Sequence, residues 1–262
     1  MVSEGQITQF ARELLAAEEA RKPIDAITDR AELSVADAYK IQLEIIKTKT
    51  DRKEKVVGKK IGLTSKRMQQ AFGIDQPDYG HIIDRLILGE GFPILLSDLI
   101  QPKIEVEIAF VLKEDLIGPG VTAAEVLRCT LGVLPCFEVI DSRIKDWKIK
   151  IQDTIADNAS IGRVVLGSPL SSVSGTDLRS VGVVVRKNGE VAETAAGAAV
   201  MGNPVDAVAW LANKLSEHGV QLKTGEIIIS GSLIAPIEIA DRDVIQAEFS
   251  GNFGSITAYV KK

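Results

Sequence analysis

Three glutamates in two apolar segments are the residues of this chain best suited to hold a metal ion. Glu105 and Glu107 alternate with isoleucine and valine in segment 103–112, and Glu138 stands alone inside the apolar run 133–140. If the first segment is a strand, both of its carboxylates project from one face, because strand side chains alternate with a period of two. A buried carboxylate is costly unless it is neutralised or paired, so three converging carboxylates would call for a divalent cation.

The ligand types available restrict which ion such a site would hold. Only two histidines and two cysteines occur among the 262 residues, and they do not have zinc-binding spacing. Oxygen-only ligation selects a hard ion, so we expect Mg²⁺ or Mn²⁺. Such an ion would accept a chelating 2-oxo acid and act on it as a Lewis acid. The alternative is a half-exposed antiparallel strand whose glutamates face solvent.

The first 75 residues are expected to be mainly helical. Capping patterns begin two helices, at Ser3 and at Ser34. Residues 56–63 resemble a short strand, and a brief helix follows that ends near Gly73. We therefore expect a smaller helical region over residues 1–75.

Strands dominate the remaining region, 76–262. Asn188-Gly189 lies between two apolar runs and predicts a tight hairpin, while helices are expected to begin at Thr122 and at Asn203, the second ending at Gly219. Helices and strands do not alternate strictly, so we expect an α+β fold with a mixed sheet rather than a doubly wound parallel one. The expected strands are 104–112, 133–140, 163–166, 181–187, 191–194, 226–230, 244–249 and 255–260.

Composition excludes several classes of function. The net charge is −5, which gives no reason to expect nucleic acid or an anionic membrane as partner. No phosphate-binding glycine motif occurs, and no apolar stretch approaches the ~18 residues of a membrane span. The first residues lack the features of a signal peptide, so we expect a cytoplasmic protein. The histidines, His81 and His218, are expected at the surface.

Five motifs occur in one order along the chain. Together they closely resemble the 2-keto-4-pentenoate (2-hydroxypenta-2,4-dienoate) hydratase and 4-oxalocrotonate decarboxylase family of the fumarylacetoacetate hydrolase superfamily. The resemblance covers nearly the whole chain and implies a mixed sheet rolled around the active site, with a smaller helical N-terminal part. The motifs are GKKIGLTS at 58–65, QPDYG at 76–80, PKIEVEIA at 102–109, EVIDSR at 138–143 and ADNAS at 156–160.

The resemblance also implies roles for individual residues and a site that depends on Mg²⁺ or Mn²⁺. Glycines on both sides of Lys60 admit close approach of a ligand, and burial beside a metal ion would lower the pKa of this lysine. The matching positions are Glu105, Glu107 and Glu138 for the metal ion, Lys60 and Asp78 for catalysis, and Ser160 and Ser232 for the substrate.

Other polar and aromatic residues are expected to have structural roles. Lys59 would be a solvated lysine on an edge strand. Arg143 would form an ion pair with nearby Asp141. Trp147 and Trp210 would be packing residues.

Both activities of the family need the dienolate of a 2-oxo acid, and they differ at the far end of the pocket. The runs 76–80, 143–153 and 230–233 resemble the hydratases more closely. We therefore expect hydration of 2-hydroxypenta-2,4-dienoate to 4-hydroxy-2-oxopentanoate in meta-cleavage degradation of aromatic compounds. The alternatives are a 4-oxalocrotonate decarboxylase and a non-catalytic partner subunit. The resemblance further implies a homo-oligomer and association with the decarboxylase or hydratase of the same pathway.

Overall fold

Two β-sheets form the centre of the computed structural model, which describes residues 2–168 and 170–262. The larger sheet has eight strands among these residues, and the smaller has five. Strands of the larger sheet are β1 (Val56–Gly62), β2 (Asp78–Ile83), β3 (Ile87–Gly89), β5 (Lys103–Leu112), β6 (Thr130–Ile140), β7 (Ile161–Leu166), β10 (Ile227–Ile229) and β11 (Ile237–Glu238). Strands of the smaller sheet are β4 (Ile94–Leu95), β8 (Gly182–Lys187), β9 (Glu190–Ala196), β12 (Val244–Phe249) and β13 (Ser255–Lys261).

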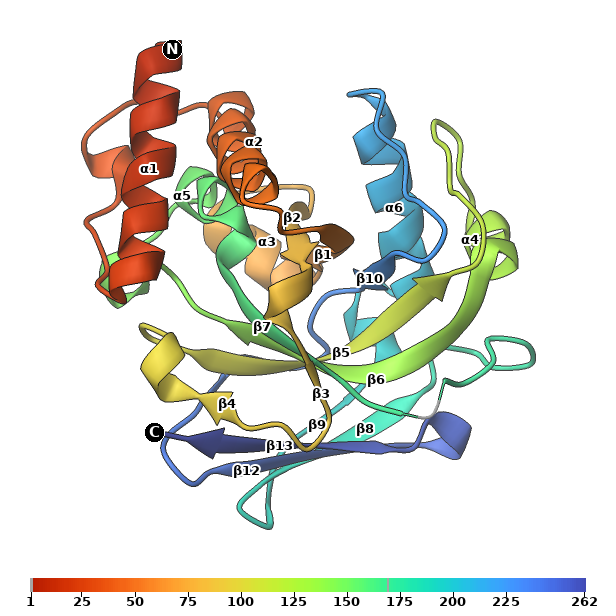
Figure 1. Cartoon of the computed structure of the whole chain (residues 1–262). Coiled ribbons are helices and arrows are strands. Elements are labelled where there is room, and N and C mark those ends of the chain that lie inside the picture. The colour runs from red at the N-terminus through yellow and green to blue at the C-terminus, as the bar shows by residue number, and fades with distance from the viewer. Residues whose placement is uncertain (1, 169) are drawn as a thin grey trace.

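The helices at 4–20, 35–51 and 151–156 lie over the larger sheet on the side away from the smaller one (Figure 1). The larger sheet runs β2-β1-β10-β5-β6-β7-β3 with β11 paired to β5, and the smaller runs β4-β13-β12-β8-β9. Parallel pairs (β1 with β10, β3 with β7) occur beside antiparallel ones, so the expected mixed α+β architecture is confirmed. The helices are α1 (Glu4–Ala20), α2 (Val35–Asp51), α3 (Lys66–Phe72), α4 (Ala123–Cys129), α5 (Ile151–Ala156) and α6 (Pro204–Ser216).

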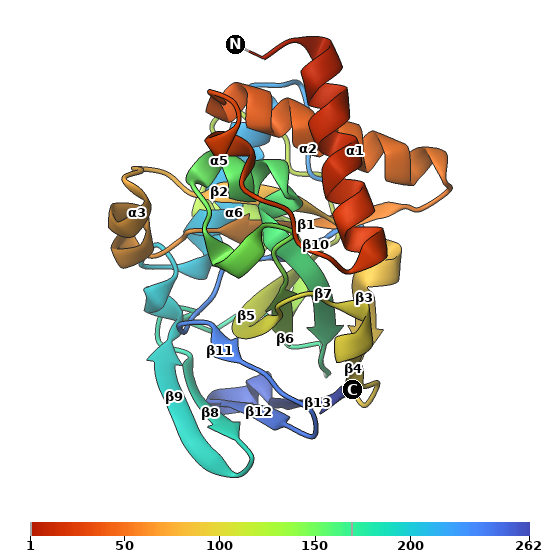
Figure 2. The ribbon, with the colours of Figure 1, turned by 90° about the vertical axis from the view of Figure 1, so that its left-hand side faces the viewer.

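The main apolar core lies between the two sheets and extends to α4 and α6, which pack against the same face of the larger sheet. Ile104, Val106 and Ile108 of β5 belong to it, together with Val185 of β8 and Ile245 of β12. Because β5 alternates with a period of two, its glutamates project from the opposite face, toward α1, α2 and α5. Figure 2 shows the smaller sheet below β5 and β6, and α1, α2 and α5 above them.

The N-terminal helices form where their capping residues predict. Ser3 makes a complete capping box with Gln6, and the Ser34 side chain accepts a hydrogen bond from the Asp37 backbone. Apolar faces of α1, α2 and α5 share a second buried cluster, in which Ile155 of α5 lies. Helix α5, which carries the start of the ADNAS motif, was not expected from the sequence.

Strand β1 belongs to the larger sheet although it lies within the first 75 residues. It is hydrogen-bonded to β2 on one side and to β10 on the other. Lys59 is therefore not on an edge strand, and the expectation of a solvated lysine is wrong: its side chain is buried and forms an ion pair with Glu226 at 2.8 Å. The division at residue 75 stays a prediction.

In the C-terminal half, local turn and capping residues correctly predict a hairpin turn and the start of a helix. Asn188 and Gly189 have φ of 55° and 88° and join β8 to β9, as expected for a two-residue hairpin. Helix α6 begins after the cap Asn203 as predicted, but it ends at Ser216, and Gly219 lies in the following turn. Among the described residues, no helix combines the length and apolar character needed to cross a bilayer.

Candidate metal and active site

The three glutamates converge at the point where β5 and β6 lie side by side. Glu105 is directly opposite Glu138 in the antiparallel ladder. Carboxylate oxygens of Glu105, Glu107 and Glu138 all lie within 4.8 Å of one another. Glu107 and Glu138 are 1% and 0% exposed, so the alternative of glutamates facing solvent is excluded for these two.

Several oxygens in this carboxylate cluster lack a hydrogen-bond partner. Glu107 accepts one bond at Oε2, from the Gly231 backbone N–H at 2.7 Å, but its Oε1 accepts none. Glu138 Oε2 accepts none, and Glu138 Oε1 has only its ion pair with Lys60. Native proteins satisfy nearly all buried polar atoms, and each exception calls for an explanation. A divalent cation coordinated by these oxygens satisfies them and neutralises their charge, so the residues present fit such an ion.

The pKa values of the cluster show how strongly the ionised forms are opposed. Burial raises the pKa of Glu105 to about 8, and repulsion from Glu138 adds to it. Burial likewise raises the pKa of Glu107, with further repulsion from Glu138 and Glu105. The pKa of Glu138 is also raised by burial, against the opposing effect of Lys60. Without a compensating cation, therefore, some of these carboxyl groups are protonated at neutral pH.

Among the described residues, Lys60 is the one cationic side chain that contacts the carboxylate cluster. Its Nζ lies 3.0 Å from Glu138 Oε1 and donates to the carbonyl oxygen of Ala159 at 3.0 Å. Burial lowers the pKa of Lys60, but the charges of Glu138 and Asp78 outweigh burial and raise it above the ordinary value. This rise comes from the negative charge of the neighbouring carboxylates, and the fall expected beside a bound metal ion stays a prediction.

Pro77, directly before Asp78, is typical of a turn, but Asp78 lies at the start of strand β2. Its carboxylate occupies the space that a side chain at residue 62 would take: a Cβ on Gly62 would lie 2.1 Å from Asp78 Oδ1. Burial raises the pKa of Asp78 to about 6, although Lys60 opposes the shift. Gly62 therefore leaves room for the carboxyl group of Asp78, which titrates near neutral pH.

A cavity of about 760 Å³ opens beside the cluster and collects most of the expected site residues. Its walls include Lys60, Asp78, Glu105, Glu107, Ser160 and Ser232, whereas the fully buried Glu138 does not line it. Ser160 donates to Asp157 Oδ2 at 3.3 Å, and Ser232 donates to the carbonyl of Ile234 at 2.8 Å. The structure thus brings the seven residues singled out from the sequence to one place.

Sequence reasoning missed part of the cavity wall. Trp147, expected to be a packing residue, lines the cavity, and its indole nitrogen donates to the carbonyl of Gln101 at 3.1 Å. Lys103 also lines it, with Nζ 5.5 Å from the Trp147 ring centroid. A signal for Lys103 was available, because it is two residues before Glu105 and therefore on the same face of the strand.

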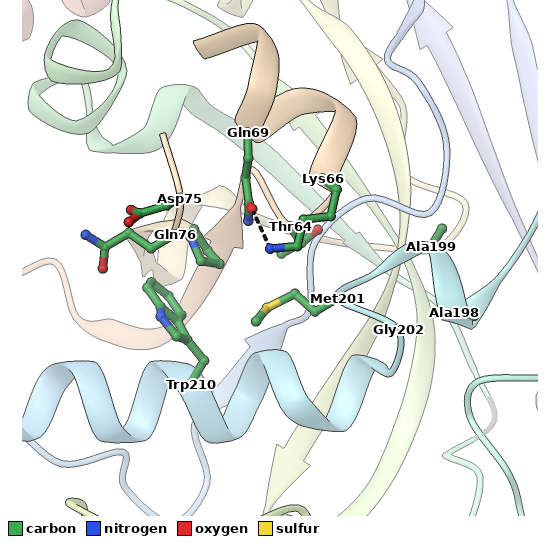
Figure 3. Close-up of a pocket in the computed structure, with 11 residues that line it drawn as sticks. Thr64, Lys66, Gln69, Asp75, Gln76, Ala198, Ala199, Met201, Gly202 and Trp210 are labelled. Carbon is green, nitrogen blue, oxygen red and sulfur yellow. Dashed lines mark hydrogen bonds between the residues drawn. The ribbon is translucent and has the colours of Figure 1, made fainter. Parts of the chain in front are cut away.

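A second hollow of about 520 Å³ adjoins the cavity and shares Thr64 and Ala199 with it. Figure 3 shows Trp210 and Met201 on one side, facing Lys66 and Gln69 of α3. Gln69 is satisfied: it accepts from Lys66 at 3.3 Å and donates to the carbonyl of Leu63 at 3.0 Å. No carboxylate cluster is found among the described residues of this hollow, so we place the chemistry in the larger cavity.

Two further expectations need correction. Arg143 forms its ion pair with Asp157, at 2.5 Å, and contacts Asp141 only through the backbone carbonyl. His81 is buried, not at the surface: its Nδ1 lies 3.0 Å from Gln42 Oε1, and burial lowers its pKa to about 3. Each pairing joins residues that only the fold brings together.

Comparison with known proteins identifies the family. The model of the fumarylacetoacetate (FAA) hydrolase C-terminal family matches residues 69–261, so the chain belongs to this family. A 2-hydroxypent-2,4-dienoate hydratase of Pseudomonas putida is 50% identical over 216 residues, which cover 82% of this chain and 97% of the relative. A 4-oxalocrotonate decarboxylase of the same species is 41% identical over 254 residues, covering 97% and 96%. Within the family, the chain thus belongs with hydratases and decarboxylases, both of which are lyases.

The solved structures agree with this grouping. The structure of 4-oxalocrotonate decarboxylase from Pseudomonas putida G7, complexed with magnesium and adipate, has a TM-score of 0.96. It is 39% identical in sequence, and the match covers 99% of both chains. A second structure of that decarboxylase, complexed with calcium and acetate, has a TM-score of 0.94, also at 39% identity and 99% coverage of both chains.

Proposed function

We propose that this chain is a divalent-metal-dependent hydratase that adds water to 2-hydroxypenta-2,4-dienoate and forms 4-hydroxy-2-oxopentanoate in meta-cleavage degradation of aromatic compounds. The observation that carries the proposal is the buried cluster of Glu105, Glu107 and Glu138 beside a cavity that also holds Lys60 and Asp78. Relatives named as hydratases of 2-hydroxypentadienoate and 2-hydroxyhexadienoate, 50% and 46% identical, support the choice of substrate.

The three glutamates would hold Mg²⁺ or Mn²⁺. Their unpartnered oxygens and the absence of nitrogen or sulfur ligands from the cluster favour a hard ion. Once bound, such an ion polarises the 2-oxo group of the substrate and stabilises the negative charge that develops there.

Lys60 and Asp78 would carry out the proton transfers. The Lys60 ammonium is a charged donor in a buried site, where its hydrogen bonds are strong because water does not compete. With a pKa of about 6, Asp78 can gain or lose a proton near neutral pH, which suits a general acid or base. Ser160 and Ser232 offer hydroxyl groups to the substrate, and a water molecule held in the cavity adds at C4.

A 4-oxalocrotonate decarboxylase is the second candidate, and one feature of the cavity favours it. Arg67 and Lys103 line the same cavity and would meet a second carboxylate at the far end of a dicarboxylic substrate. The solved decarboxylase of similar fold is complexed with adipate, itself a dicarboxylate.

Parallel assays with the two substrates separate these functions. We expect loss of 2-hydroxypenta-2,4-dienoate absorbance with Mg²⁺ or Mn²⁺ present and no loss after EDTA treatment. Release of CO₂ from 4-oxalocrotonate without any hydration would instead assign the decarboxylase. Turnover of neither substrate would indicate the third alternative, a non-catalytic partner subunit.

We also propose that the protein works in the cytoplasm as a homo-oligomer, since closed homo-oligomers are the commonest state of soluble assemblies. Association with the decarboxylase or hydratase of the same pathway is proposed by analogy with the family, and no nucleic-acid or membrane partner is proposed. Light scattering of the protein alone, and after mixing with such a partner, tests both assemblies: monomers alone and no complex on mixing would contradict them.

A further inference from the structure

Three consecutive non-glycine residues between α5 and β7 adopt the left-handed conformation directly beside Lys60. Asn158, Ala159 and Ser160 have φ of 52°, 51° and 54°. Residues with side chains rarely adopt this conformation, and a run of three persists only where surrounding contacts impose it. All three are buried, so these contacts come from the protein.

The Asn158 side chain supplies one such contact by pairing with a single residue of β2. Its Oδ1 accepts from the His81 backbone N–H at 2.8 Å, and its Nδ2 donates to the His81 carbonyl at 2.9 Å. Within the described part of the larger sheet β2 is a terminal strand, so the amide satisfies backbone groups that have no partner strand. Gly80 permits this approach, since a Cβ there would lie 2.6 Å from the Asn158 carbonyl oxygen.

The turn formed by residues 158–160 presents a carbonyl oxygen to the active-site lysine. Lys60 Nζ donates to Ala159 O at 3.0 Å, and the same nitrogen lies 3.0 Å from Glu138 Oε1. Lys60 is also opposite Gly80 in the ladder of β1 and β2, so β2 anchors both the backbone of the lysine and the turn that binds its amine. A lysine side chain is long and flexible, and two fixed acceptors restrict its ammonium to one place.

We propose that Asn158 is a positioning residue: its amide fixes the left-handed turn 158–160 on β2, and the Ala159 carbonyl in that turn holds the Lys60 ammonium beside the carboxylate cluster. The inference rests on the proposed function, in which Lys60 transfers protons. Asn158 acts on turnover through Lys60, and the ligands of the metal ion, which lie on β5 and β6, stay in place.

A matched pair of variants isolates this effect from a general loss of stability. Asn213 on α6 makes the same two-way amide pair with one residue, Val121, at 2.8 and 3.0 Å, and it lines neither cavity. For Asn158→Ala we expect kcat to fall by about 10- to 100-fold, the effect of misplacing a catalytic group by roughly 1 Å. The Mg²⁺ dissociation constant should stay within about threefold. KM should rise by less than kcat falls, because Ser160 of the cavity wall shares the turn but Lys60 acts in turnover.

The control variant Asn213→Ala should lose similar thermal stability and keep its kcat. Equal kcat values for the two variants would overturn the proposal. Should Asn158→Ala fail to fold, Asn158→Gly replaces it, because glycine adopts a positive φ at no steric cost. That variant also lacks the amide, so its kcat should fall as well, and a kcat equal to that of the unchanged protein would overturn the proposal.

A structural measurement keeps this inference separate from the proposed function. In a crystal structure of Asn158→Ala with Mg²⁺, we expect Lys60 Nζ to have moved out of hydrogen-bonding distance of Ala159 O. A turn and an amine that stay where they are would refute the positioning role, whatever reaction the protein catalyses. If the unchanged protein converts neither substrate, the proposed function fails, but the same crystal structure still decides whether Asn158 positions Lys60.

Discussion

Two groups of buried charges lie near the C-terminal end of β6, and they differ in how completely their polar atoms are satisfied. In the first, Arg143 donates to Asp157 Oδ1 and to the backbone carbonyls of Asp141, Asp157 and Ile161. In the second, the carboxylate cluster of Glu105, Glu107 and Glu138, Glu107 Oε1 and Glu138 Oε2 accept no hydrogen bond, and Glu138 Oε1 has only its ion pair with Lys60.

A structural ion pair differs from a ligand site in whether the protein itself supplies the countercharge and the hydrogen-bond partners. Burial opposes the charge of Arg143, but Asp157 and other acidic neighbours outweigh it and raise its pKa above the ordinary value. Burial also raises the pKa of Asp157 to about 6, but both of its carboxylate oxygens accept hydrogen bonds from Arg143, so the pair is satisfied within the protein. Burial also opposes charge in the carboxylate cluster, yet there Lys60 is the only cation in contact among the described residues, and the carboxyl pKa values rise. The cluster becomes electrostatically complete only with an added cation.

The largest expected effect comes from removing one charge of the cluster. Glu105→Gln should reduce metal-dependent turnover on the order of 10³-fold, because a bound ion supplies several kcal/mol of transition-state stabilisation. The melting temperature should stay the same or rise, since one of three repelling carboxylates is gone. Steady-state kinetics and calorimetry measure the two effects. Glu248→Gln, on an exposed position of β12, serves as the control with unchanged activity; turnover that persisted in Glu105→Gln would show the metal assignment to be wrong.

At the structural ion pair we expect a loss of stability and not a specific loss of turnover. Arg143→Met leaves Asp157 buried without its partner, which should lower the free energy of unfolding by about 3–5 kcal/mol. Urea denaturation measures this loss. The matched control is Arg186→Met, whose arginine is partly exposed on β8 with a carboxylate 3.8 Å away. This change should cost less than about 1 kcal/mol. Equal losses in the two variants would contradict the structural role of Arg143.

Metal binding should stabilise the protein through the carboxylate cluster alone. At a Mg²⁺ concentration about 100 times the dissociation constant, we expect about 2.7 kcal/mol of added stability. Thermal unfolding with Mg²⁺ and with EDTA measures the difference. The Mg²⁺ effect should disappear in Glu105→Gln and persist in Arg143→Met, so a loss in both variants would show that the comparison of the two sites is wrong.

A smaller effect is expected from pH in the metal-free protein. The pKa of Glu105 is about 8 in the folded state, above its ordinary value of 4.5, so between these values the folded state binds more protons than the unfolded one. Stability should therefore fall as the pH rises from about 5 to 8, by on the order of 1–2 kcal/mol. Unfolding in EDTA at several pH values measures this slope, and saturating Mg²⁺ should reduce it. A stability that rose with pH in EDTA would contradict the raised pKa.

Much of the fold could be predicted from local sequence. Capping residues such as Ser34 and Asn203 and the turn at Asn188-Gly189 act on their immediate neighbours, so the sequence predicts where elements begin. Strand β2 escaped prediction because Pro77 suggested a turn, and α5 because six residues give too little periodicity. The short strands β3, β4 and β11 escaped for the same reason.

In the candidate site, too, the sequence predicts some features and leaves others to the tertiary structure. The period of two in β5 placed Glu105 and Glu107 on one face, and the sequence alone determined that pattern and the hard, oxygen-only character of the ligands. Only the tertiary structure decided that Glu138 lies opposite Glu105, that Arg143 pairs with Asp157 and that Asn158 binds β2 at His81. These contacts join segments far apart in the chain, so they depend on strand register and packing, which short-range periodicity does not encode.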